Sequence, residues 1–307
     1  MQVKWTKTNQ IAKAAYNSEK YEAQLKKKGA VSFFTFPMYE NIPFIRHGFS
    51  TREGGVSKGY LGTMNLSYSR GDEDANVDEN YHRICQALDM DTKNLVLSDQ
   101  IHETVVYRAG KKDCQGNDLK EKKLTGIDGL VTNERNTVLS TSYADCVPLF
   151  FVDEEKRAIG LSHSGWRGTV GKIGAKTVDK MQKEFGSRPE KLKVMIGPSI
   201  CQECYEVSKD VKEAFENFVS VEQIADVQKM QTAKVQELVD CVFQRKKAEK
   251  YQLDLWMANK LILMEAGVVE KNIGVSCVCT CCNSELLYSH RASKGMRGNL
   301  SAFLEIV

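Results

Sequence analysis

The sequence predicts a mixed α/β fold, because short apolar runs typical of strands alternate along it with longer stretches of helical periodicity. The apolar runs are bounded by glycine, proline and polar turn residues, as buried strands usually are. The helical stretches carry apolar residues three and four positions apart, which places them on one face of a helix. With 307 residues, 42% of them hydrophobic, the chain can bury a large core.

The expected elements follow from these two patterns. Strands are expected at 31–36, 95–97, 138–140, 146–152, 158–161, 192–196 and 273–278. Helices are expected at 76–90, 168–185, 207–219 and 253–266. The last of these ends before Gly267, a typical helix stop. The polar stretch 106–126 predicts a mobile surface loop, and the charged stretch 230–250 predicts helical elaboration around the core.

Composition also suggests the domain organisation. Residues 1–30 predict an N-terminal helical extension, since 10–28 is rich in alanine, lysine and glutamate and contains neither proline nor glycine. The rest of the chain, 31–307, shows no feature that demands a boundary. We therefore expect a single domain there.

Charge and composition exclude several classes of protein. The 43 basic and 40 acidic residues leave a net charge of +3, so no nucleic-acid partner is expected. No apolar run approaches the roughly 20 residues that span a bilayer, so no membrane partner is expected either. The N-terminus lacks the charged, apolar and small-residue pattern of a signal peptide, which predicts a cytoplasmic protein with reduced thiols. The sequence carries no indication of the oligomeric state.

The stretch 140–168 carries the strongest functional pattern. If its two apolar runs pair as a hairpin, Cys146 at the start of the first and His163 at the end of the second lie side by side. His102 follows an earlier strand and offers a third ligand. Two histidines and one cysteine, with room for water, form the open three-ligand set of a catalytic zinc site.

Other interpretations of these residues remain open. A lone cysteine at a strand end is usually a small buried hydrophobe, and a lone histidine is usually structural. Cys146 could also be the nucleophile of a cysteine hydrolase, with His163 as its base. A multicopper laccase is disfavoured, because it needs a histidine-rich cluster besides a blue-copper site and the chain has five histidines. Two of these, His47 and His82, lie in unrelated contexts.

Two features could bind an anion such as phosphate. The loop 47–65 combines several glycines with Arg52, whose planar guanidinium suits phosphate oxygens. The alternative interpretation is a flexible surface loop. The helix expected after His163 would point its N-terminus toward that residue, and Arg167 could contact the same anion.

Cysteines outside this stretch form a second pattern. Cys201 and Cys204 have the CxxC spacing of half a structural zinc site or of a redox pair. Four more cysteines crowd a later stretch, namely Cys277, Cys279, Cys281 and Cys282. A second metal site made from both groups is an open alternative, although two adjacent cysteines count against a closed four-ligand site.

A series of short motifs runs from about residue 44 to residue 306. In chain order they are HGFSTR at 47–52, GGVS at 54–57, NLS at 65–67, QIH at 100–102, DGL at 128–130, DC at 145–146, HSGWRG at 163–168, IGP at 196–198, CYEV at 204–207, DL at 254–255, AN at 258–259, CT at 279–280 and SHR at 289–291. The series resembles the laccase-domain family, the bacterial YfiH and YlmD type of protein.

This resemblance implies a layered α/β/β/α sandwich with mixed β-sheets and a zinc ion bound by His102, Cys146 and His163. It also implies a purine nucleoside phosphorylase that converts adenosine, inosine, guanosine and methylthioadenosine to free base and sugar 1-phosphate, with adenosine deaminase activity. Purine nucleosides and phosphate are therefore the expected partners of a laccase-domain catalytic domain at 31–307. The residues that we expect to contact substrate or phosphate are Arg52, Asn65, Gln100 and Arg167.

Asp145 is the candidate proton shuttle for deamination, in which zinc-bound water attacks the base. The alternative role for Asp145 is a structural carboxylate that orients a ligand imidazole. A competing function from another class is a peptidoglycan-precursor editing factor, since some bacterial members of the family are linked to that process.

Overall fold

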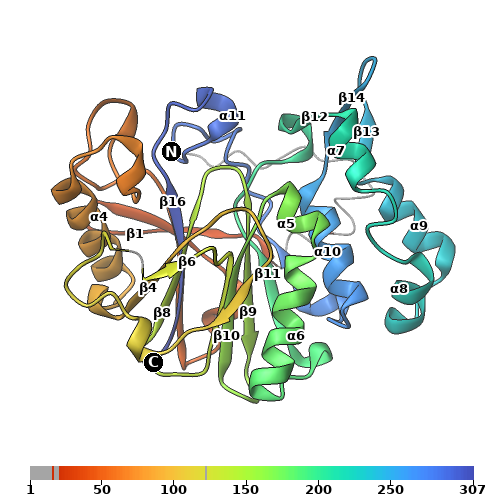
Figure 1. The fold of residues 1–307 in the computed structure, drawn as a ribbon, viewed down its shortest axis with the longest axis horizontal. Coiled ribbons are helices and arrows are strands. Elements are labelled where there is room, and N and C mark those ends of the chain that lie inside the picture. Colours follow the sequence, from red (N-terminus) through yellow and green to blue (C-terminus); the bar gives the residue numbers. More distant parts are fainter. Residues whose placement is uncertain (1–15, 17–20, 122) are drawn as a thin grey trace.

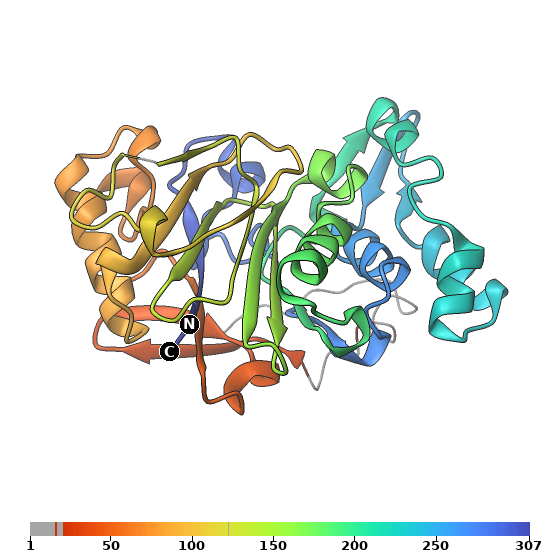
Figure 2. The same cartoon turned by 60° about the horizontal axis from the view of Figure 1, so that its bottom comes forward.

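The computed structural model describes residues 16, 21–121 and 123–307. The described residues form two β-sheets packed face to face, with helices on both outer faces (Figure 1 and Figure 2). This arrangement confirms the α/β/β/α sandwich with mixed sheets.

The first sheet has the spatial order β1-β2-β3-β16-β8-β4-β6. The bounds of these strands are β1 (Gln24–Lys28), β2 (Val31–Thr35), β3 (Ile45–Ser50), β16 (Leu300–Ile306), β8 (Val138–Tyr143), β4 (Leu95–Asp99) and β6 (Leu124–Thr125). β4 runs parallel to both of its neighbours, and the other pairs are antiparallel. The strand β16, late in the chain, therefore lies in the middle of this sheet.

The second sheet has the order β15-β11-β9-β10-β7-β5. Its strands are β15 (Ile273–Val275), β11 (Lys193–Ile196), β9 (Val147–Asp153), β10 (Ala158–Ser164), β7 (Gly129–Thr132) and β5 (Val106–Arg108). β9 and β10 are buried along their whole length, which explains why they are continuous apolar runs rather than alternating ones. A small third sheet contains β12 (Glu206–Ser208), β14 (Lys250–Leu253) and β13 (Phe243–Arg245).

Helices pack on the outer faces of the two large sheets and on one another. The α-helices are α3 (Pro37–Glu40), α4 (Asp74–Ala87), α5 (Trp166–Val170), α6 (Ile173–Phe185), α7 (Lys209–Ala214), α8 (Val221–Gln228), α9 (Thr232–Asp240), α10 (Leu255–Glu265) and α11 (His290–Ser293). Short 3-10 turns are η1 (Gly59–Leu61), η2 (Tyr68–Arg70), η3 (Thr92–Asn94), η4 (Lys111–Asp113), η5 (Pro189–Lys191), η6 (Gln202–Cys204) and η7 (Glu270–Asn272). None of the helices in the described part of the chain is long and apolar enough to cross a membrane.

Three apolar clusters hold the layers together. The cluster between the sheets includes Phe49, Phe150 and Leu161, each with no more than traces of exposed surface. On one side the apolar stripe of α4 packs against the first sheet, and on the other side α6 and α10 pack against the second (Figure 1). α10 is buried on all sides, and Asp254 caps it by accepting a hydrogen bond from the Met257 amide at 3.0 Å.

The predicted hairpin around the functional stretch is confirmed. β9 and β10 pair antiparallel, with His163 opposite Pro148 and Ser164 opposite Val147. Cys146 immediately precedes β9, so the hairpin brings it next to His163 as expected.

Several local predictions were wrong. Within the predicted N-terminal helix, Gln24–Lys28 is strand β1, because a two-residue turn with Gly29 at φ 61° lets it pair with β2. Pairing overrides the helical propensity of its lysines here. Most of the remaining predicted extension, 1–15 and 17–20, lies outside the described residues.

Other differences concern the predicted helices and loop. The helix at 168–185 is two helices, α5 and α6, separated at Lys172, whose φ is 58°. The stretch 207–219 contains only the short α7, and 230–250 contains α9 followed by β13. The polar stretch 106–126 contributes β5 and β6 to the sheets.

Candidate active site

Three side chains meet at one end of the β9–β10 hairpin. They are His102, Cys146 and His163, and their ligand atoms all lie within 4.8 Å of one another. The imidazole rings of the two histidines are edge to face, with centroids 4.7 Å apart. His102 follows β4 in a turn where its φ is 63°, a backbone conformation that only a few per cent of non-glycine residues adopt. His163 is buried, whereas His102 is exposed.

Asp128 fixes both histidines. Its buried carboxylate accepts hydrogen bonds from the backbone amides of His102 at 3.1 Å and of Glu103 at 3.0 Å. It also accepts a hydrogen bond from Nδ1 of His163 at 2.8 Å. With Nδ1 occupied by Asp128, Nε2 is the ring nitrogen of His163 that can face a cation once it has lost its proton, as in carboxylate–histidine–metal arrangements. Sequence reasoning noted the DGL motif but gave Asp128 no role.

The charges of these groups support one another. Burial by itself raises the pKa of Cys146, but the nearby His163 and His102 outweigh it and lower that pKa to about 6. Burial by itself lowers the pKa of His163, but Cys146 and Asp128 outweigh it and raise that pKa to about 9. Burial likewise opposes ionisation of Asp128, yet hydrogen bonds from His163 and from backbone amides lower its pKa overall. At neutral pH and without a metal ion, these pKa shifts favour a thiolate on Cys146 beside an imidazolium on His163.

The donor set fits a metal ion. Two imidazoles and a thiolate are ligands that zinc prefers, and three protein ligands leave a position open. The backbone also fits closely around them, since a Cβ built on Gly165 would lie 3.0 Å from Nδ1 of His102 and 3.1 Å from Sγ of Cys146. Glycine at this position lets the turn after β10 approach the ligands.

The same structure argues against a multicopper centre. His47 is buried and stacked on Phe36, and its Nε2 accepts a hydrogen bond from the Phe36 amide at 2.8 Å. His82 lies on the exposed face of α4. Within the described ranges, potential ligands converge in two groups, and only this one contains histidine. A histidine-rich copper cluster is therefore absent from the described part of the chain.

The three ligands open onto a cavity of about 350 Å³, within the usual range for small-molecule sites. Polar groups dominate its lining, with contributions from the ends of β4 and β8, the turn η2, and the segment before β16. The lining residues are Leu66, Ser67, Tyr68, Ser69, Arg70, Tyr81, Leu97, Ser98, Asp99, Gln100, His102, Lys120, Ser140, Ser142, Tyr143, Ala144, Cys146, His163, Arg297 and Asn299.

Two predicted contact residues lie at or near this cavity. Gln100 lines it, and its side-chain amide bridges to Ser142 by accepting from the backbone amide at 2.7 Å and donating to the carbonyl at 3.2 Å. Asn65 is fully buried and lies behind the wall of the cavity. It accepts from the Asn299 amide and donates to the Ser67 carbonyl, both at 3.0 Å. Asn65 therefore joins two segments that line the cavity.

The two predicted phosphate-binding arginines point elsewhere. The guanidinium of Arg52 donates to the carbonyls of Gly62 at 2.9 Å and Ser284 at 3.0 Å, and it stacks over the ring of Tyr288 at 4.8 Å. Arg167 is exposed and lies over the ring of Trp166 at 4.3 Å. Neither residue is part of the cavity wall. The helix that begins at Trp166, α5, contains Arg167 and has only five residues, so it is much shorter than the helix predicted at 168–185.

Two other arginines line the cavity instead. Arg70 ends η2, and Arg297 precedes β16. Each has a buried Nε without a hydrogen-bond partner among the described residues. Burial, together with the charge of Arg70, lowers the pKa of Arg297 to about 10. Two cations held close to each other beside a cavity indicate an anion-binding wall.

Asp145 does not line the cavity, and its carboxylate is occupied by two other groups. Its carboxylate accepts from the Thr280 hydroxyl at 2.6 Å and from the Arg291 amide at 2.7 Å. It is not a lining residue, and the imidazole-orienting role predicted as its alternative belongs to Asp128. Asp145 therefore braces the turn that leads into Cys146.

Comparison with known proteins identifies relatives of this chain. A family model described as multi-copper polyphenol oxidoreductase laccase matches residues 46–306. Purine nucleoside phosphorylase YlmD of Bacillus subtilis is 37% identical over 259 residues, which covers 84% of this chain and 87% of that protein. Adenosine deaminase RL5, from an unknown prokaryotic organism, is 33% identical over 251 residues, covering 79% of this chain and 87% of that protein.

A solved structure extends the match to the fold. The crystal structure of the Bacillus licheniformis hypothetical protein YfiH superposes with a TM-score of 0.81 at 27% identity, covering 92% of this chain and 99% of that one. The ligand triad, the layered sandwich and the family match lead to one conclusion: the chain belongs to the laccase-domain family of YfiH-type and YlmD-type proteins.

Proposed function

We propose that the protein is a zinc-dependent purine nucleoside phosphorylase. The observation that carries this proposal is one cavity with an open three-ligand site at one wall and two partly unsatisfied arginines at another. The names of its relatives supply the substrate class. The expected substrates are adenosine, inosine, guanosine and methylthioadenosine.

His102, Cys146 and His163 would hold the zinc ion. When bound, zinc supplies a Lewis acid and lowers the pKa of coordinated water to about 7. Asp128 holds both histidines in place, through Nδ1 of His163 and the backbone of His102. The raised pKa of His163 and the lowered pKa of Cys146 in the protein alone give way, on metal binding, to a neutral imidazole and a thiolate.

Arg70 and Arg297 would bind the phosphate. In phosphorolysis, a phosphate oxygen forms a bond to C1′ of the ribose as the bond from C1′ to N9 breaks. The purine leaves with the electron pair, and the proton of hydrogen phosphate ends on the base. The two guanidiniums would neutralise the phosphate and orient it for this attack, which is a positioning effect.

Adenosine deamination is a second candidate, favoured by the same metal centre and by the relative named adenosine deaminase. That reaction needs a carboxylate to transfer protons. Asp145 does not line the cavity, and the carboxylate among the lining residues is that of Asp99. Asp99 therefore replaces Asp145 as the candidate proton shuttle.

The test is to incubate zinc-loaded protein with inosine or adenosine, with and without inorganic phosphate. We expect free base and sugar 1-phosphate only when phosphate is present. A rate independent of phosphate would favour the cysteine-hydrolase alternative with Cys146 and His163. No turnover of any nucleoside, with a muramyl precursor converted instead, would favour the peptidoglycan-editing alternative.

Arginine variants sharpen this test. Loss of one charge-assisted contact costs about 2 kcal/mol, so Arg297→Ala or Arg70→Ala should raise the KM for phosphate about thirtyfold. The zinc content should not change. Arg52→Ala is the matched control, since its guanidinium is bonded to backbone carbonyls away from the cavity. It should lower stability and leave the KM for phosphate unchanged.

A further inference from the structure

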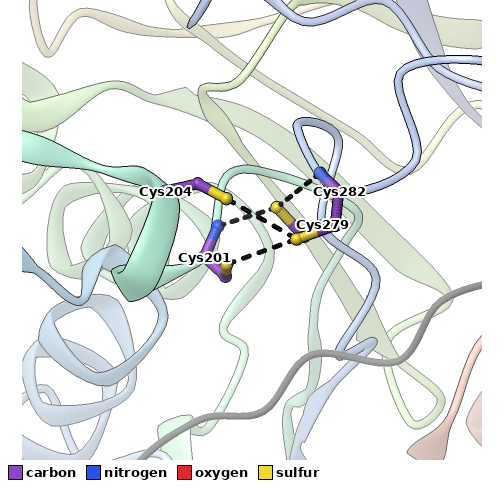
Figure 3. A group of neighbouring side chains, drawn as sticks. All are labelled: Cys201, Cys204, Cys279 and Cys282. Atoms are coloured by element: carbon purple, nitrogen blue, oxygen red, sulfur yellow. Dashed lines mark hydrogen bonds between the residues drawn. The ribbon is translucent and has the colours of Figure 1, made fainter. Parts of the chain in front are cut away.

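Four cysteines outside the active site gather at one point. Figure 3 shows Cys201, Cys204, Cys279 and Cys282 with their side chains pointing toward one another. Their sulfur atoms all lie within 4.8 Å of one another. Sγ of Cys282 lies 3.5 Å from Sγ of Cys204 and 4.0 Å from Sγ of Cys201. None of the ten cysteines, all of which the structure describes, forms a disulfide.

The cluster joins two CxxC pairs that are far apart in sequence. Cys201 and Cys204 lie at the two ends of the short segment that forms η6, after β11. Cys279 and Cys282 follow β15, which is the parallel neighbour of β11. A β-bridge between Ser199 and Cys279 continues this pairing beyond the strands. The sheet itself therefore places the two pairs opposite each other.

Backbone amides already point at one of the sulfurs. The amide of Cys201 donates to Sγ of Cys279 at 3.3 Å, and the amide of Cys282 donates to the same atom at 3.4 Å (Figure 3). Hydrogen bonds from N–H groups stabilise a thiolate more than a neutral thiol, because they supply partial positive charge. The sulfur of Cys279 is fully buried, so these donors act away from bulk water.

We propose that Cys201, Cys204, Cys279 and Cys282 bind a second zinc ion, as a closed structural site. Zinc with four thiolates is tetrahedral with Zn–S bonds of about 2.3 Å, which gives sulfur–sulfur separations of about 3.8 Å. The separations of Cys282 from Cys204 and Cys201, 3.5 and 4.0 Å, lie on either side of that value. Binding replaces four S–H protons by one Zn²⁺, so the site carries a net charge of −2 and four protons are released.

A pair of disulfides is the main alternative, and the geometry is less suited to it. A disulfide needs two sulfurs at about 2.05 Å and uses its cysteines in pairs. Here Cys282 is close to both Cys201 and Cys204, so no single partner is preferred. Four sulfurs near one centre are the arrangement that a tetrahedral ion requires.

The proposed cysteine zinc site would stabilise the active site through hydrogen bonds to Asp145. Thr280 lies between two of the cysteines, and its hydroxyl donates to Asp145, the residue before Cys146. The amide of Ile200, next to Cys201, donates to the carbonyl of Asp145 at 3.0 Å. Both arms of the cluster thus hold the turn that carries the active-site thiolate, although the cluster itself does not line the cavity.

The experiment is metal analysis of the full chain, purified under reducing conditions, stripped of metal and reloaded with zinc. We expect two zinc ions per chain. The double variant His102→Ala/His163→Ala removes the active-site ligands and should keep one. Loading that variant with cobalt should give the intense visible bands and the sulfur-to-metal charge-transfer band of tetrahedral cobalt thiolate.

Variants of the cluster complete the test. In the His102→Ala/His163→Ala background, Cys279→Ser should remove the remaining metal and the cobalt spectrum. Cys281→Ser is the matched control from the same loop and should retain both. Cys279→Ser could fail to fold. The proposal is therefore tested independently by the zinc count of the wild-type chain and by the cobalt spectrum of the His102→Ala/His163→Ala variant, both of which keep all four cysteines. A single zinc in the wild-type chain, a cobalt spectrum without thiolate bands, or an intact mass showing cluster disulfides under reducing conditions would each overturn the proposal.

Discussion

The two groups of side chains that could hold a metal ion differ in what surrounds them. His102, Cys146 and His163 open onto a cavity of about 350 Å³, and one of the three is exposed. The cysteine cluster has four ligands, two of them fully buried, and none of its members lines that cavity. The thiolate is common to both. What separates a reactive site from a structural one is therefore the number of protein ligands and the access to a polar cavity, rather than the type of ligand.

Substitution of Cys146 should separate the two groups most sharply. We expect Cys146→Ser to lose the active-site metal and the activity together, because a hydroxyl is a poor zinc ligand at neutral pH. The loss should exceed the roughly 10- to 100-fold cost of removing a group that only orients a ligand. Zinc analysis and turnover of inosine are the measurements. Retained zinc with abolished turnover, or a covalent adduct trapped on Cys146 of the wild type, would contradict the ligand role.

A smaller effect is expected at Asp128. Asp128→Asn keeps the shape of the side chain but removes the charge that stabilises Nδ1–H of His163. We expect zinc affinity at the open site to fall about 10- to 100-fold, measured by competition with a chelator. The metal of the cysteine cluster should stay bound.

Asp145→Asn is the control for this change, since the Asp145 carboxylate contacts Thr280 and the Arg291 amide rather than a ligand imidazole. Its effect on zinc affinity should be smaller than that of Asp128→Asn. Equal effects would mean that Asp128 has no specific part in orienting His163.

The smallest expected effect is a severalfold difference in thiol reactivity in the metal-free protein. The neighbouring histidines lower the pKa of Cys146 to about 6, so its thiolate fraction should rise through pH 6 as the pH increases. Hydrogen bonds shared with Cys204, Cys279 and Cys282 raise the pKa of Cys201, so this thiol should stay protonated at neutral pH. Alkylation by iodoacetamide, followed by peptide mass spectrometry across pH 5–9, measures both. An alkylation midpoint of Cys146 near the 8.5 of a free thiol would contradict the lowered pKa.

Much of the fold could be predicted from sequence, and so could the convergence of His102, Cys146 and His163. The hairpin of β9 and β10 could be predicted from sequence because both strands contain continuous apolar runs. The hairpin places Cys146 beside His163. Strand β1 could not be predicted from sequence, because its lysine-rich sequence has helical propensity and only pairing with β2 makes it a strand. Propensity is a weak guide wherever a neighbouring strand offers hydrogen bonds.

The rest of the site depends on contacts between distant segments. Asp128 acts through backbone amides in the turn around His102, whose left-handed conformation has no sequence signal. Arg70 and Arg297 line one cavity because their distant segments are joined by hydrogen bonds, from the Leu66 amide to the Asn299 carbonyl and from the Asn299 amide to Asn65. The second CxxC pair, Cys279 and Cys282, was missed from sequence, because Cys281 lies next to Cys282 and obscures the spacing.

The central position of β16 has a consequence for how the protein folds. Phe303 of this strand pairs with Gly48 on one side and Ser140 on the other, so β16 is the strand that joins β3 to β8 in the sheet. Such long-range pairing is slow, because a large chain loop must close before any hydrogen bond forms. During synthesis, the first sheet must therefore wait for the ribosome to release residues beyond 300. Arg297 lies just before this strand, so the cavity lacks part of its wall until the sheet is complete.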